Sequence, residues 1–538
     1  MHSTMMSVPL NLSHFLERAG KLFGGQEIVS RMPDKSLHRY TYADFYGRTR
    51  QLAEALQRAG LKRGDRVATL MWNHYAHYES YFGVIVAGGV MHTLNLRLAA
   101  DDIAFIAKHA EDRFLIVDDV LLPLFEQFRQ KVNLERVIVV PLTGKPVPAG
   151  FDDYEGLLRT ATGDFEYPQM DENEPCAMCY TSGTTGKPKG VVYSHRSQIL
   201  HSLVQALPDA ISIGGSDVML PVVPMFHANA WGVPYTCVMT GSKLVLAGSN
   251  VQPEGLLDLL ITERVTVASG VPTVWIGVLD ALERNPGRWK LDWPVRVICG
   301  GSTPPMELMR KLDRYGIRML HLWGMTETSP LATASHLKSH MRDWPEEKKY
   351  QTRAKQGWTV PFLDLRIMRP EGEVPRDGET PGEIEVRGPW VASHYYEAPD
   401  QSHRWTSDGW FKTGDVGVMD EDGIVKIVDR AKDLVKSGGE WISSVDLENT
   451  LMGHPAVKEA CVVGVPHPKW QERPIAAVVL KDGAAAEPDE LLAFLGKTFA
   501  KWQLPDAFVF MKEIPRTSVG KFKKVALRQE LSNWKWDA

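Results

Sequence analysis

The first half of the chain alternates amphipathic segments of helical period with short apolar runs. Thr41 and Asp44 form a predicted capping box at the start of one helix. Apolar side chains then recur at helical spacing, at Phe45, Leu52 and Leu56. The next predicted elements are a strand at 67–71, a helix around 103–107 and a strand at 114–117. Alternation of this kind predicts a largely parallel sheet with helices on its faces.

The pattern changes after about residue 357. Short β-like runs, separated by turn signals, follow at 365–368, 382–386 and 425–428. They predict a β-rich subdomain at about 357–430. Further on, strands at 460–465, 475–480 and 508–511 accompany a predicted helix at 487–499. We therefore expect an α/β fold with a large N-terminal domain of parallel sheets, 1–431, joined by a hinge to a small α+β C-terminal domain, 432–538.

Composition and charge are those of a globular protein. Of the 538 residues, 44% are hydrophobic, and 61 Lys and Arg against 66 Asp and Glu leave a net charge of −5. This slightly acidic balance argues against a general nucleic-acid binder. The most apolar stretch, 81–90, is too short to span a bilayer, so only peripheral membrane contact stays open. The five cysteines are an odd, sparse set, which indicates a reducing compartment and predicts a cytoplasmic protein.

The strongest local signal is the segment 181–190. It combines glycines, hydroxyl groups and lysines: Gly183, Gly186 and Gly190; Ser182, Thr184 and Thr185; Lys187 and Lys189. Glycines let backbone N–H groups turn toward an anion, while the hydroxyl and ammonium groups add donors and charge. The segment is no Walker A loop, because Thr181 and Pro188 stand where that pattern needs Gly and Ser or Thr. It predicts a phosphate-binding loop, with an ordinary polar turn as the alternative.

This segment resembles the signature loop of the acyl-adenylate-forming superfamily. That superfamily includes acyl-CoA synthetases, the adenylation domains of nonribosomal peptide synthetases and beetle luciferases. The resemblance extends over nearly the whole chain, through several motifs in the same order. For the loop, it implies that ATP is bound by Thr181, Ser182, Gly183, Thr184, Thr185 and Lys187.

A second motif, Trp323-Gly324-Met325-Thr326-Glu327, resembles the superfamily's Tyr-Gly-x-Thr-Glu. The resemblance implies that Trp323 and Gly324 lie against the adenine and that Thr326 bonds a phosphate oxygen. Glu327, with Thr184, would hold Mg²⁺, which prefers oxygen ligands. Trp323 stands where Tyr is usual, a departure that keeps the aromatic face for stacking and loses the phenol hydroxyl.

Two other matches concern the rest of the nucleotide. Gly301 and Ser302 follow an apolar run and resemble the segment that lies along the adenine, where glycines let a planar ring approach the backbone. Asp415, in a Thr-Gly-Asp triplet, matches the residue whose two carboxylate oxygens accept both ribose hydroxyls. The resemblance also implies that Arg430 contacts the ribose or a phosphate.

The remaining matches lie at and beyond the predicted hinge. Lys432 matches the hinge residue itself, although Asp429 stands where the superfamily more often has Gly. A glycine-containing loop resembles the lining of the pantetheine tunnel and implies CoA binding by Lys436, Ser437, Gly438 and Gly439. Lys521 matches the C-terminal catalytic lysine, which would reach the α-phosphate and the attacking carboxylate. Without the motif, Lys521 would be read as a solvated surface charge.

The segment His-x-Asn-Ala-Trp, from His227 to Trp231, is the candidate acid site. It resembles the fatty-acyl-CoA synthetase branch, in which the Trp gates an acyl tunnel. The resemblance implies that His227 lies near the carboxylate and that Trp231 is the gate. Val233 belongs to the apolar stretch that follows and is a candidate wall of an alkyl pocket.

These matches together predict an acyl-CoA synthetase that uses ATP, Mg²⁺ and CoA to activate a small-molecule carboxylic acid. A medium- or long-chain fatty acid is the first expectation. A short thioether or branched acid such as methylmercaptopropionate is an alternative, and so is the loading of a carrier protein in trans. A luciferase-like oxidase and a non-catalytic nucleotide sensor are further alternatives, the latter disfavoured by Glu327 together with Lys521. Some fatty-acyl relatives are homodimers, so a homodimer is also considered.

Overall fold

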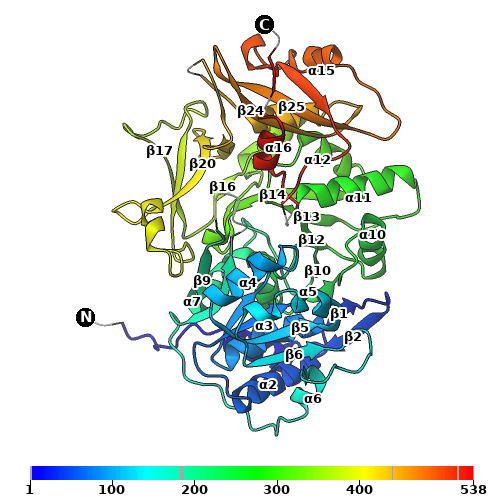
Figure 1. Cartoon of the computed structure of the whole chain (residues 1–538), viewed down its shortest axis with the longest axis vertical. Helices are drawn as coiled ribbons and strands as arrows, with labels where there is room; N and C mark the ends of the chain where they lie inside the picture. Colours follow the sequence, from blue (N-terminus) through cyan, green and yellow to red (C-terminus); the bar gives the residue numbers. More distant parts are fainter. Residues whose placement is uncertain (1–2, 182–186, 439, 518–519, 533, 537–538) are drawn as a thin grey trace.

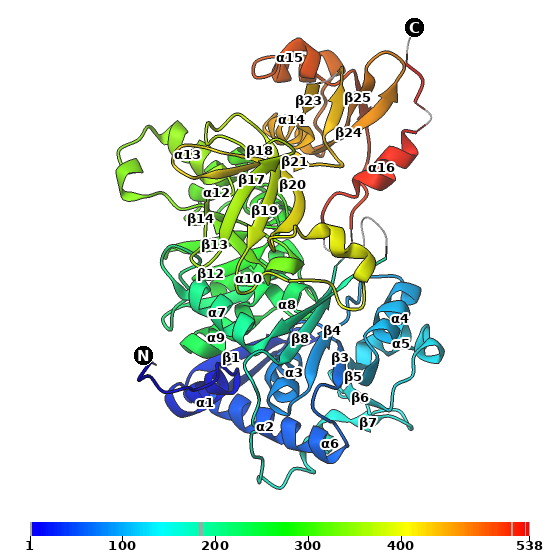
Figure 2. The ribbon, with the colours of Figure 1, turned by 90° about the vertical axis from the view of Figure 1, so that its left-hand side faces the viewer.

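The structure is a computed structural model that describes residues 3–181, 187–438, 440–517, 520–532 and 534–536. It confirms the predicted α/β fold: two large, mainly parallel sheets carry helices, and a β-rich part and a small α+β part follow along the chain. Figures 1 and 2 show the small C-terminal part, in orange and red, at the end of the molecule opposite the first helices.

The larger sheet has the strand order β16-β15-β14-β13-β12-β10-β11-β1-β2. The strands from β14 to β1 in this order run parallel, and both edges are antiparallel. Their bounds are β1 Glu27–Arg31, β2 Leu37–Thr41, β10 Val218–Pro221, β11 Lys243–Leu246, β12 Val267–Gly270, β13 Val295–Cys299, β14 Ile317–Gly324, β15 Leu331–Ala334 and β16 Trp358–Thr359. The carboxyl ends of β10, β12, β13 and β14 therefore meet at one edge, where open α/β sheets commonly bind ligands.

The second sheet has the order β7-β6-β5-β3-β4-β8-β9 and is parallel except for the pair β8–β9. Its strands are β3 Arg66–Leu70, β4 Val90–Thr93, β5 Asp112–Asp118, β6 Arg136–Val140, β7 Asp152–Asp153, β8 Pro175–Tyr180 and β9 Gly190–Ser194. The antiparallel hairpin β8–β9 brackets the predicted phosphate loop. Of that loop, Ser182, Gly183, Thr184, Thr185 and Gly186 lie outside the described residues.

The helices of this large part cover and connect the two sheets. They are α1 Ser13–Leu22, α2 Tyr42–Arg58, α3 Tyr75–Val86, α4 Ala100–His109, α5 Leu122–Glu126, α6 Tyr154–Leu158, α7 His195–Ala206, α8 Ala228–Trp231, α9 Val233–Thr240, α10 Pro253–Thr262, α11 Pro272–Arg284, α12 Met306–Asp313 and α13 Glu346–Ala354. Helix α2 begins at the predicted capping box, in which Thr41 and Asp44 bond each other's backbone N–H groups. Helix α3 is buried along its whole length. Within the described residues, no helix combines the length and the apolar character that crossing a membrane requires.

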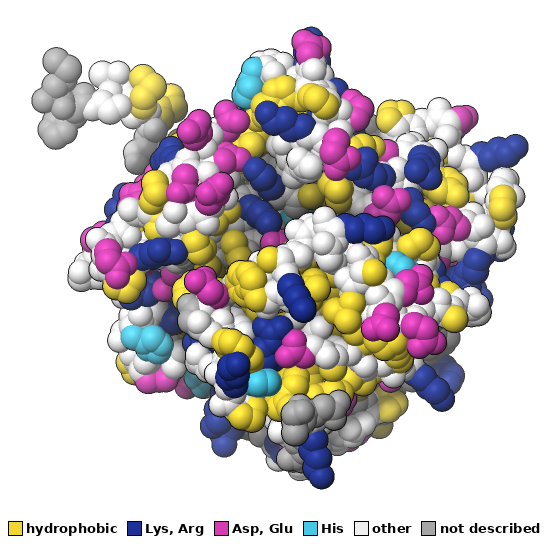
Figure 3. Space-filling model, turned by 90° about the horizontal axis from the view of Figure 1, so that it is seen from above, with side chains coloured by type: hydrophobic (Ala, Val, Ile, Leu, Met, Phe, Trp, Pro, Cys, Tyr) yellow, Lys and Arg dark blue, Asp and Glu magenta, His cyan; other side chains and the backbone are white. Residues whose placement is uncertain are grey.

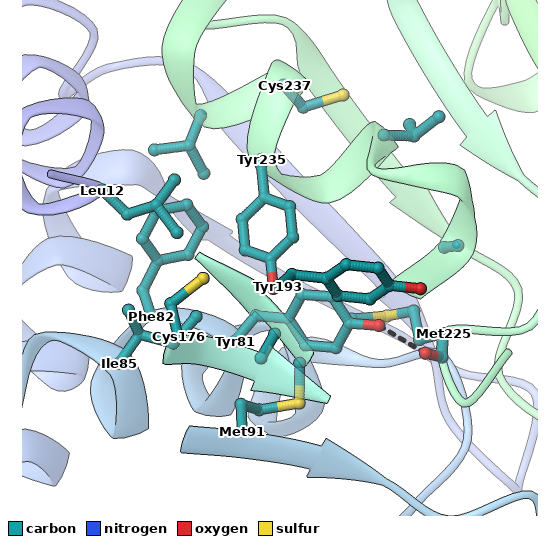
Figure 4. Close-up of a cluster of buried hydrophobic side chains, with 14 of the residues drawn as sticks. Leu12, Tyr81, Phe82, Ile85, Met91, Cys176, Tyr193, Met225, Tyr235 and Cys237 are labelled. Carbon is teal, nitrogen blue, oxygen red and sulfur yellow. Dashed lines mark hydrogen bonds between the residues drawn. The ribbon is translucent and has the colours of Figure 1, made fainter. Parts of the chain in front are cut away.

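A cluster of buried aromatic and sulfur-containing side chains fills the space between the two sheets (Figure 4). Tyr81 of α3 lies against Tyr235 of α9, with ring centroids 5.5 Å apart, and donates its hydroxyl proton to the Met225 carbonyl oxygen. Asn73 accepts the Met225 N–H at 2.7 Å. The core thus holds the loop after β10 from two sides, and this loop leads directly to His227.

A five-stranded antiparallel sheet, β18-β17-β19-β20-β21, forms the β-rich part. Its strands are β17 Asp364–Arg369, β18 Gly372–Glu373, β19 Gly382–Arg387, β20 Phe411–Met419 and β21 Val425–Arg430, which contain all three predicted β-like runs. In Figure 1 this sheet lies to one side of the large sheets, in yellow.

The C-terminal part pairs the long strands β24 Val457–His467 and β25 Gln471–Leu480. Around this pair lie β22 Val435–Ser437, β23 Glu440–Ile442, β26 Ala507–Phe510, α14 Ser444–Leu451, α15 Pro488–Leu495 and α16 Lys524–Glu530. The helix predicted at 487–499 was wrong for its last turn: α15 ends at Leu495, because Gly496 is a poor helix former and caps it. Seen from above, this side carries Lys and Arg interspersed with Asp and Glu (Figure 3).

Candidate active site

A cavity of about 360 Å³ lies where the large sheet, the β-rich sheet and the C-terminal part meet. Residues that follow the parallel strands line it, among them Val223 after β10, Val271 after β12 and Gly301 after β13. Arg430 at the end of β21 and Lys521 from the C-terminal part line it as well. The edge of the large sheet at which these strands end is thus covered by Arg430 and Lys521, which are distant from those strands in sequence.

Of the predicted nucleotide residues, several line this cavity: Thr181, Gly301, Trp323, Gly324, Thr326 and Arg430. Three do not: Asp415 is buried behind the lining, and Ser302 and Lys187 are exposed outside it. The Lys187 ammonium lies over the Phe105 ring, 5.1 Å from its centroid. The Gly324 backbone is in a crowded place, because a Cβ there would stand 1.7 Å from the Pro330 carbonyl oxygen. Because Gly324 has no side chain, its backbone packs directly against that of Pro330 at this side of the cavity.

Asp415 is buried directly behind Trp323. One of its carboxylate oxygens accepts the Trp323 indole N–H at 2.9 Å, and the other pairs with Arg430 at 3.1 Å. The pair with Asp415 raises the pKa of Arg430. The indole N–H therefore hydrogen-bonds Asp415, the predicted ribose acceptor. Trp323, which stands where Tyr is usual, thus has a structural role of its own.

Thr326 and Glu327 lie in a single 3-10 turn, η3 Thr326–Thr328, directly after β14. Tyr193 donates its hydroxyl to the Thr326 carbonyl oxygen at 2.8 Å, which fixes the turn to β9. The Glu327 side chain is buried, and its Oε1 accepts the hydroxyl of Tyr395 at 2.5 Å.

The site fits the way in which proteins commonly hold Mg²⁺. The described residues contain no group of three or more His, Cys, Asp or Glu placed to hold a metal ion. Mg²⁺ commonly takes one or two protein carboxylates and completes its shell with phosphate oxygens and water. A single buried carboxylate beside a cavity lined with Lys and Arg fits that mode of binding. Thr184, the second predicted metal residue, lies outside the described residues.

Lys521 reaches the cavity from the C-terminal part. A Cβ built on Gly301 would lie 3.3 Å from Lys521 Cε, so the lysine stem runs along the predicted adenine segment. Burial, with the nearby Arg430 charge, lowers the pKa of Lys521 to about 8. Its neighbour Lys524 instead makes a buried ion pair with Glu448 at 2.7 Å and packs the C-terminal part together.

His227 lines the same cavity. Burial, reinforced by the charges of Lys521 and Arg97, lowers the pKa of His227 to about 3. At neutral pH the imidazole is therefore uncharged, and it can orient a carboxylate by hydrogen bonding but not by positive charge.

Trp231 is placed by an unusual backbone. Five successive residues have positive φ: Ala228 (42°), Asn229 (50°), Ala230 (48°), Trp231 (60°) and Gly232 (75°). Left-handed conformations cost non-glycine residues about 1–2 kcal/mol each, and such strain often marks functional sites. Gln205 of α7 donates its amide to the Trp231 carbonyl oxygen at 2.5 Å and accepts the Thr236 hydroxyl at 2.7 Å. Val233, the predicted pocket wall, is buried in the core instead and does not line the cavity.

The predicted hinge and CoA residues are separated by the structure. Lys432 lines the cavity, between β21 and β22. Lys436 and Gly438 are exposed and outside the cavity lining, while Ser437 is buried and accepts a hydrogen bond from Arg473 at 3.0 Å. Gly439 lies outside the described residues. In this arrangement Lys521 faces the cavity, whereas the described residues Lys436, Ser437 and Gly438 do not line it.

Among the lining residues that sequence reasoning missed are the polar side chains Gln205, Tyr395 and Arg404. Arg404 donates to the carbonyl oxygens of Lys412 and Thr413, and so braces the strand that carries Asp415. Tyr395 could have been suspected from the sequence, because the adjacent tyrosines 395 and 396 stand in a charged, turn-rich segment. Gln205 gave no signal, since its importance comes from a residue 26 positions away.

Comparisons with known proteins identify the family. The sequence profile of the family described as AMP-binding enzyme matches residues 16–396, and that of the AMP-binding enzyme C-terminal domain matches residues 446–521. The chain therefore belongs to the AMP-binding enzyme family.

Particular relatives cover nearly the whole chain. A long-chain-fatty-acid–CoA ligase of Thermus thermophilus is 49% identical over 99% of this chain and 97% of its own length. A 3-methylmercaptopropionyl-CoA ligase of Ruegeria pomeroyi is 42% identical over 98% of this chain and 99% of its own. The fold is similar to that of the anthranilate CoA ligase AuaEII in complex with anthranoyl-AMP, with a TM-score of 0.86, 22% identity and 99% of both chains covered.

Proposed function

We propose that this chain is an ATP-dependent acyl-CoA synthetase that first forms an acyl-AMP and then transfers the acyl group to CoA. The observation that carries the proposal is the convergence of Lys521, Glu327, Arg430 and His227 on one cavity, although they come from separate parts of the chain. The names of the two relatives, both CoA ligases that match nearly the whole chain, support it.

In the first step, a carboxylate oxygen of the acid attacks the α-phosphorus of ATP, and pyrophosphate leaves. His227 would orient the carboxylate, and the Lys521 ammonium and Arg430 would stabilise the charge that develops on the phosphate oxygens. Mg²⁺, held by Glu327, would neutralise phosphate charge when bound. In the second step, the CoA thiolate attacks the acyl carbon and AMP leaves.

We further propose a fatty acid as the substrate. The cavity that His227 and Trp231 line is also lined by Ile211, Val223 and Leu331, whose apolar side chains suit an alkyl chain. A short thioether acid is the second candidate, favoured by the 42% identity to a 3-methylmercaptopropionyl-CoA ligase. Thioester formation on a carrier protein is the third.

Acid-dependent exchange of labelled pyrophosphate into ATP tests this proposal. A panel of saturated fatty acids of graded length and 3-methylmercaptopropionate would be compared, with and without CoA. We expect exchange with an alkanoic acid and accumulation of its CoA thioester. Exchange that no acid stimulates would refute the proposal, and adenylate that CoA does not consume would point to a carrier protein.

Three finer points belong to the same proposal. Mg²⁺ is the expected ion, because the single carboxylate of Glu327 fits its mode of binding. A cytoplasmic location is supported by the cysteines, all of which are buried free thiols. A homodimer is expected by likeness to fatty-acyl relatives alone, and sedimentation equilibrium tests it directly.

A further inference from the structure

One short segment, 390–396, touches both sides of the predicted triphosphate site. It leaves the β-rich sheet after β19 and crosses to the turn that carries Glu327. The Trp390 indole N–H donates to the Leu331 carbonyl oxygen at 2.9 Å, and the Ser329 hydroxyl donates to the Trp390 carbonyl oxygen at 2.8 Å. We call segment 390–396 the strap. It was part of none of the sequence motifs described above.

The strap holds Glu327 by both backbone and side chain. The Ala392 N–H donates to the Glu327 carbonyl oxygen at 2.8 Å. The Tyr395 hydroxyl donates to Glu327 Oε1 at 2.5 Å. Two bonds from one segment fix the position of this residue and the rotation of its carboxylate.

The same strap is tied to the phosphate loop. The Tyr396 N–H donates to the carbonyl oxygen of Gly190 at 2.9 Å, where the loop enters β9. Lys189, the preceding residue, has its ammonium 5.8 Å from the centroid of the Tyr395 ring. The strap therefore sets the spacing between the end of the phosphate loop and Glu327, and a cation bridging ATP to Glu327 would depend on this spacing.

Packing holds the Tyr395 ring in one position. Its ring is buried and packs edge-on against Trp405, with centroids 5.2 Å apart. The hydroxyl bonds Oε1, and this leaves the second oxygen, Oε2, for an ion.

We propose that Tyr395 is a positioning residue for the divalent cation that accompanies ATP: its hydroxyl fixes the Glu327 carboxylate in the orientation that binds the ion. This inference rests on the proposed function, and it adds a residue outside the recognised motifs. Residues that orient metal ligands typically contribute about 10–100-fold in metal affinity.

Tyr395→Phe is the direct test, because it removes one hydroxyl and keeps the ring against Trp405. Binding of Mn²⁺ to the enzyme with α,β-methylene-ATP would be followed by water-proton relaxation, and the Mg²⁺ dependence of pyrophosphate exchange would be measured in parallel. We expect the Mn²⁺ dissociation constant and the half-saturating Mg²⁺ concentration to rise about tenfold. The exchange rate at saturating Mg²⁺ should return to within about twofold of the unmodified enzyme, since the ion then fills the site.

Two further variants separate positioning from a general structural effect. Tyr396→Phe is the matched control, because the neighbouring Tyr396 meets Gly190 through its backbone and His109 through its ring edge, at 5.8 Å. It should leave the Mn²⁺ affinity unchanged. In a Glu327→Gln background, Tyr395→Phe should cause no further loss, because both changes act on one contact.

An unchanged Mn²⁺ affinity in Tyr395→Phe would overturn the inference, and so would an equal loss in the Glu327→Gln background. Either result with an active unmodified enzyme would leave the proposed function intact. An unmodified enzyme that neither binds the Mn²⁺ complex nor exchanges pyrophosphate with any acid would instead remove the proposed function, and this inference with it.

Discussion

At the scale of single residues, burial sets the protonation states of two titratable groups in the site. Lys521 and His227 line one cavity, yet burial gives them different protonation states at neutral pH. The pKa of Lys521, lowered to about 8, leaves it mostly charged, while His227, with a pKa of about 3, is neutral. In the proposed reaction the cavity would thus present the cations Lys521 and Arg430 to the phosphates and a neutral ring to the acid.

This difference predicts how adenylation depends on pH. The Lys521 ammonium is fully present well below pH 8 and is lost as the pH rises through about 8. Because kcat/KM reports groups of the free enzyme, kcat/KM for ATP in pyrophosphate exchange should fall on this alkaline side. Lys521→Arg should move the fall to higher pH, since a guanidinium keeps its proton.

Lys523→Arg is the control for that experiment, because Lys523 is close in sequence and outside the cavity lining. It should leave the alkaline fall near pH 8. If Lys521→Arg also leaves the fall in place, a different group is responsible and the assignment of the pH dependence to Lys521 is wrong.

At the scale of elements, regular helices and strands followed from the sequence, whereas the turn at the acid site did not. The capping box at Thr41 and the β-like runs were predictable because local chemistry and hydrophobic period agree there. Four successive non-glycine residues with positive φ contradict local preference, so only tertiary contacts such as that of Gln205 can maintain them. The pairing of β1 with β11, more than 200 residues apart, was equally beyond sequence reasoning.

The left-handed turn gives a prediction for Gly232→Ala. Gly232 has φ +75°, and a Cβ there would lie 2.7 Å from the buried His201 ring. We expect a loss of about 1–2 kcal/mol from the backbone and about 1–3 kcal/mol from overpacking, measured by denaturant unfolding. KM for the acid should rise more than KM for ATP, because the turn carries Trp231 and not the nucleotide residues.

Gly316→Ala is a close match for comparison. Gly316 has the same φ of +75°, and a Cβ there would meet no other atom within 4 Å, so only the backbone cost applies. Equal destabilisation by the two substitutions, or an unchanged KM for the acid in Gly232→Ala, would show that the turn's contact with His201 does not shape the acid site.

At the scale of the whole molecule, the two candidate functional loops of the C-terminal part differ in position relative to the cavity. Lys521 lines the cavity, while Lys436 and Gly438 are exposed away from it. The motifs predicted both roles, but a sequence does not state which loop faces the cavity, because that depends on the docking of a whole domain. The structure places Lys521 and Lys432 at the cavity, which is the arrangement that the proposed adenylation step would need.

Because the loops that carry Lys521 and Gly438 are separate, we expect that adenylation and thioester formation can each be lost without the other. Lys521→Ala removes a charge that this arrangement brings to the phosphates, so pyrophosphate exchange should fall about 10²–10³-fold, as for other groups that stabilise developing charge. Conversion of supplied acyl-AMP and CoA to thioester should stay within about threefold, because that step would use the other loop after the domain rotates about Lys432.

Gly438→Val is the reciprocal variant: Gly438 is exposed here, so exchange should be kept, while thioester formation from acyl-AMP should slow. Equal loss of both half-reactions in either variant would contradict a rotating C-terminal domain, since a fixed domain would use one arrangement for both steps.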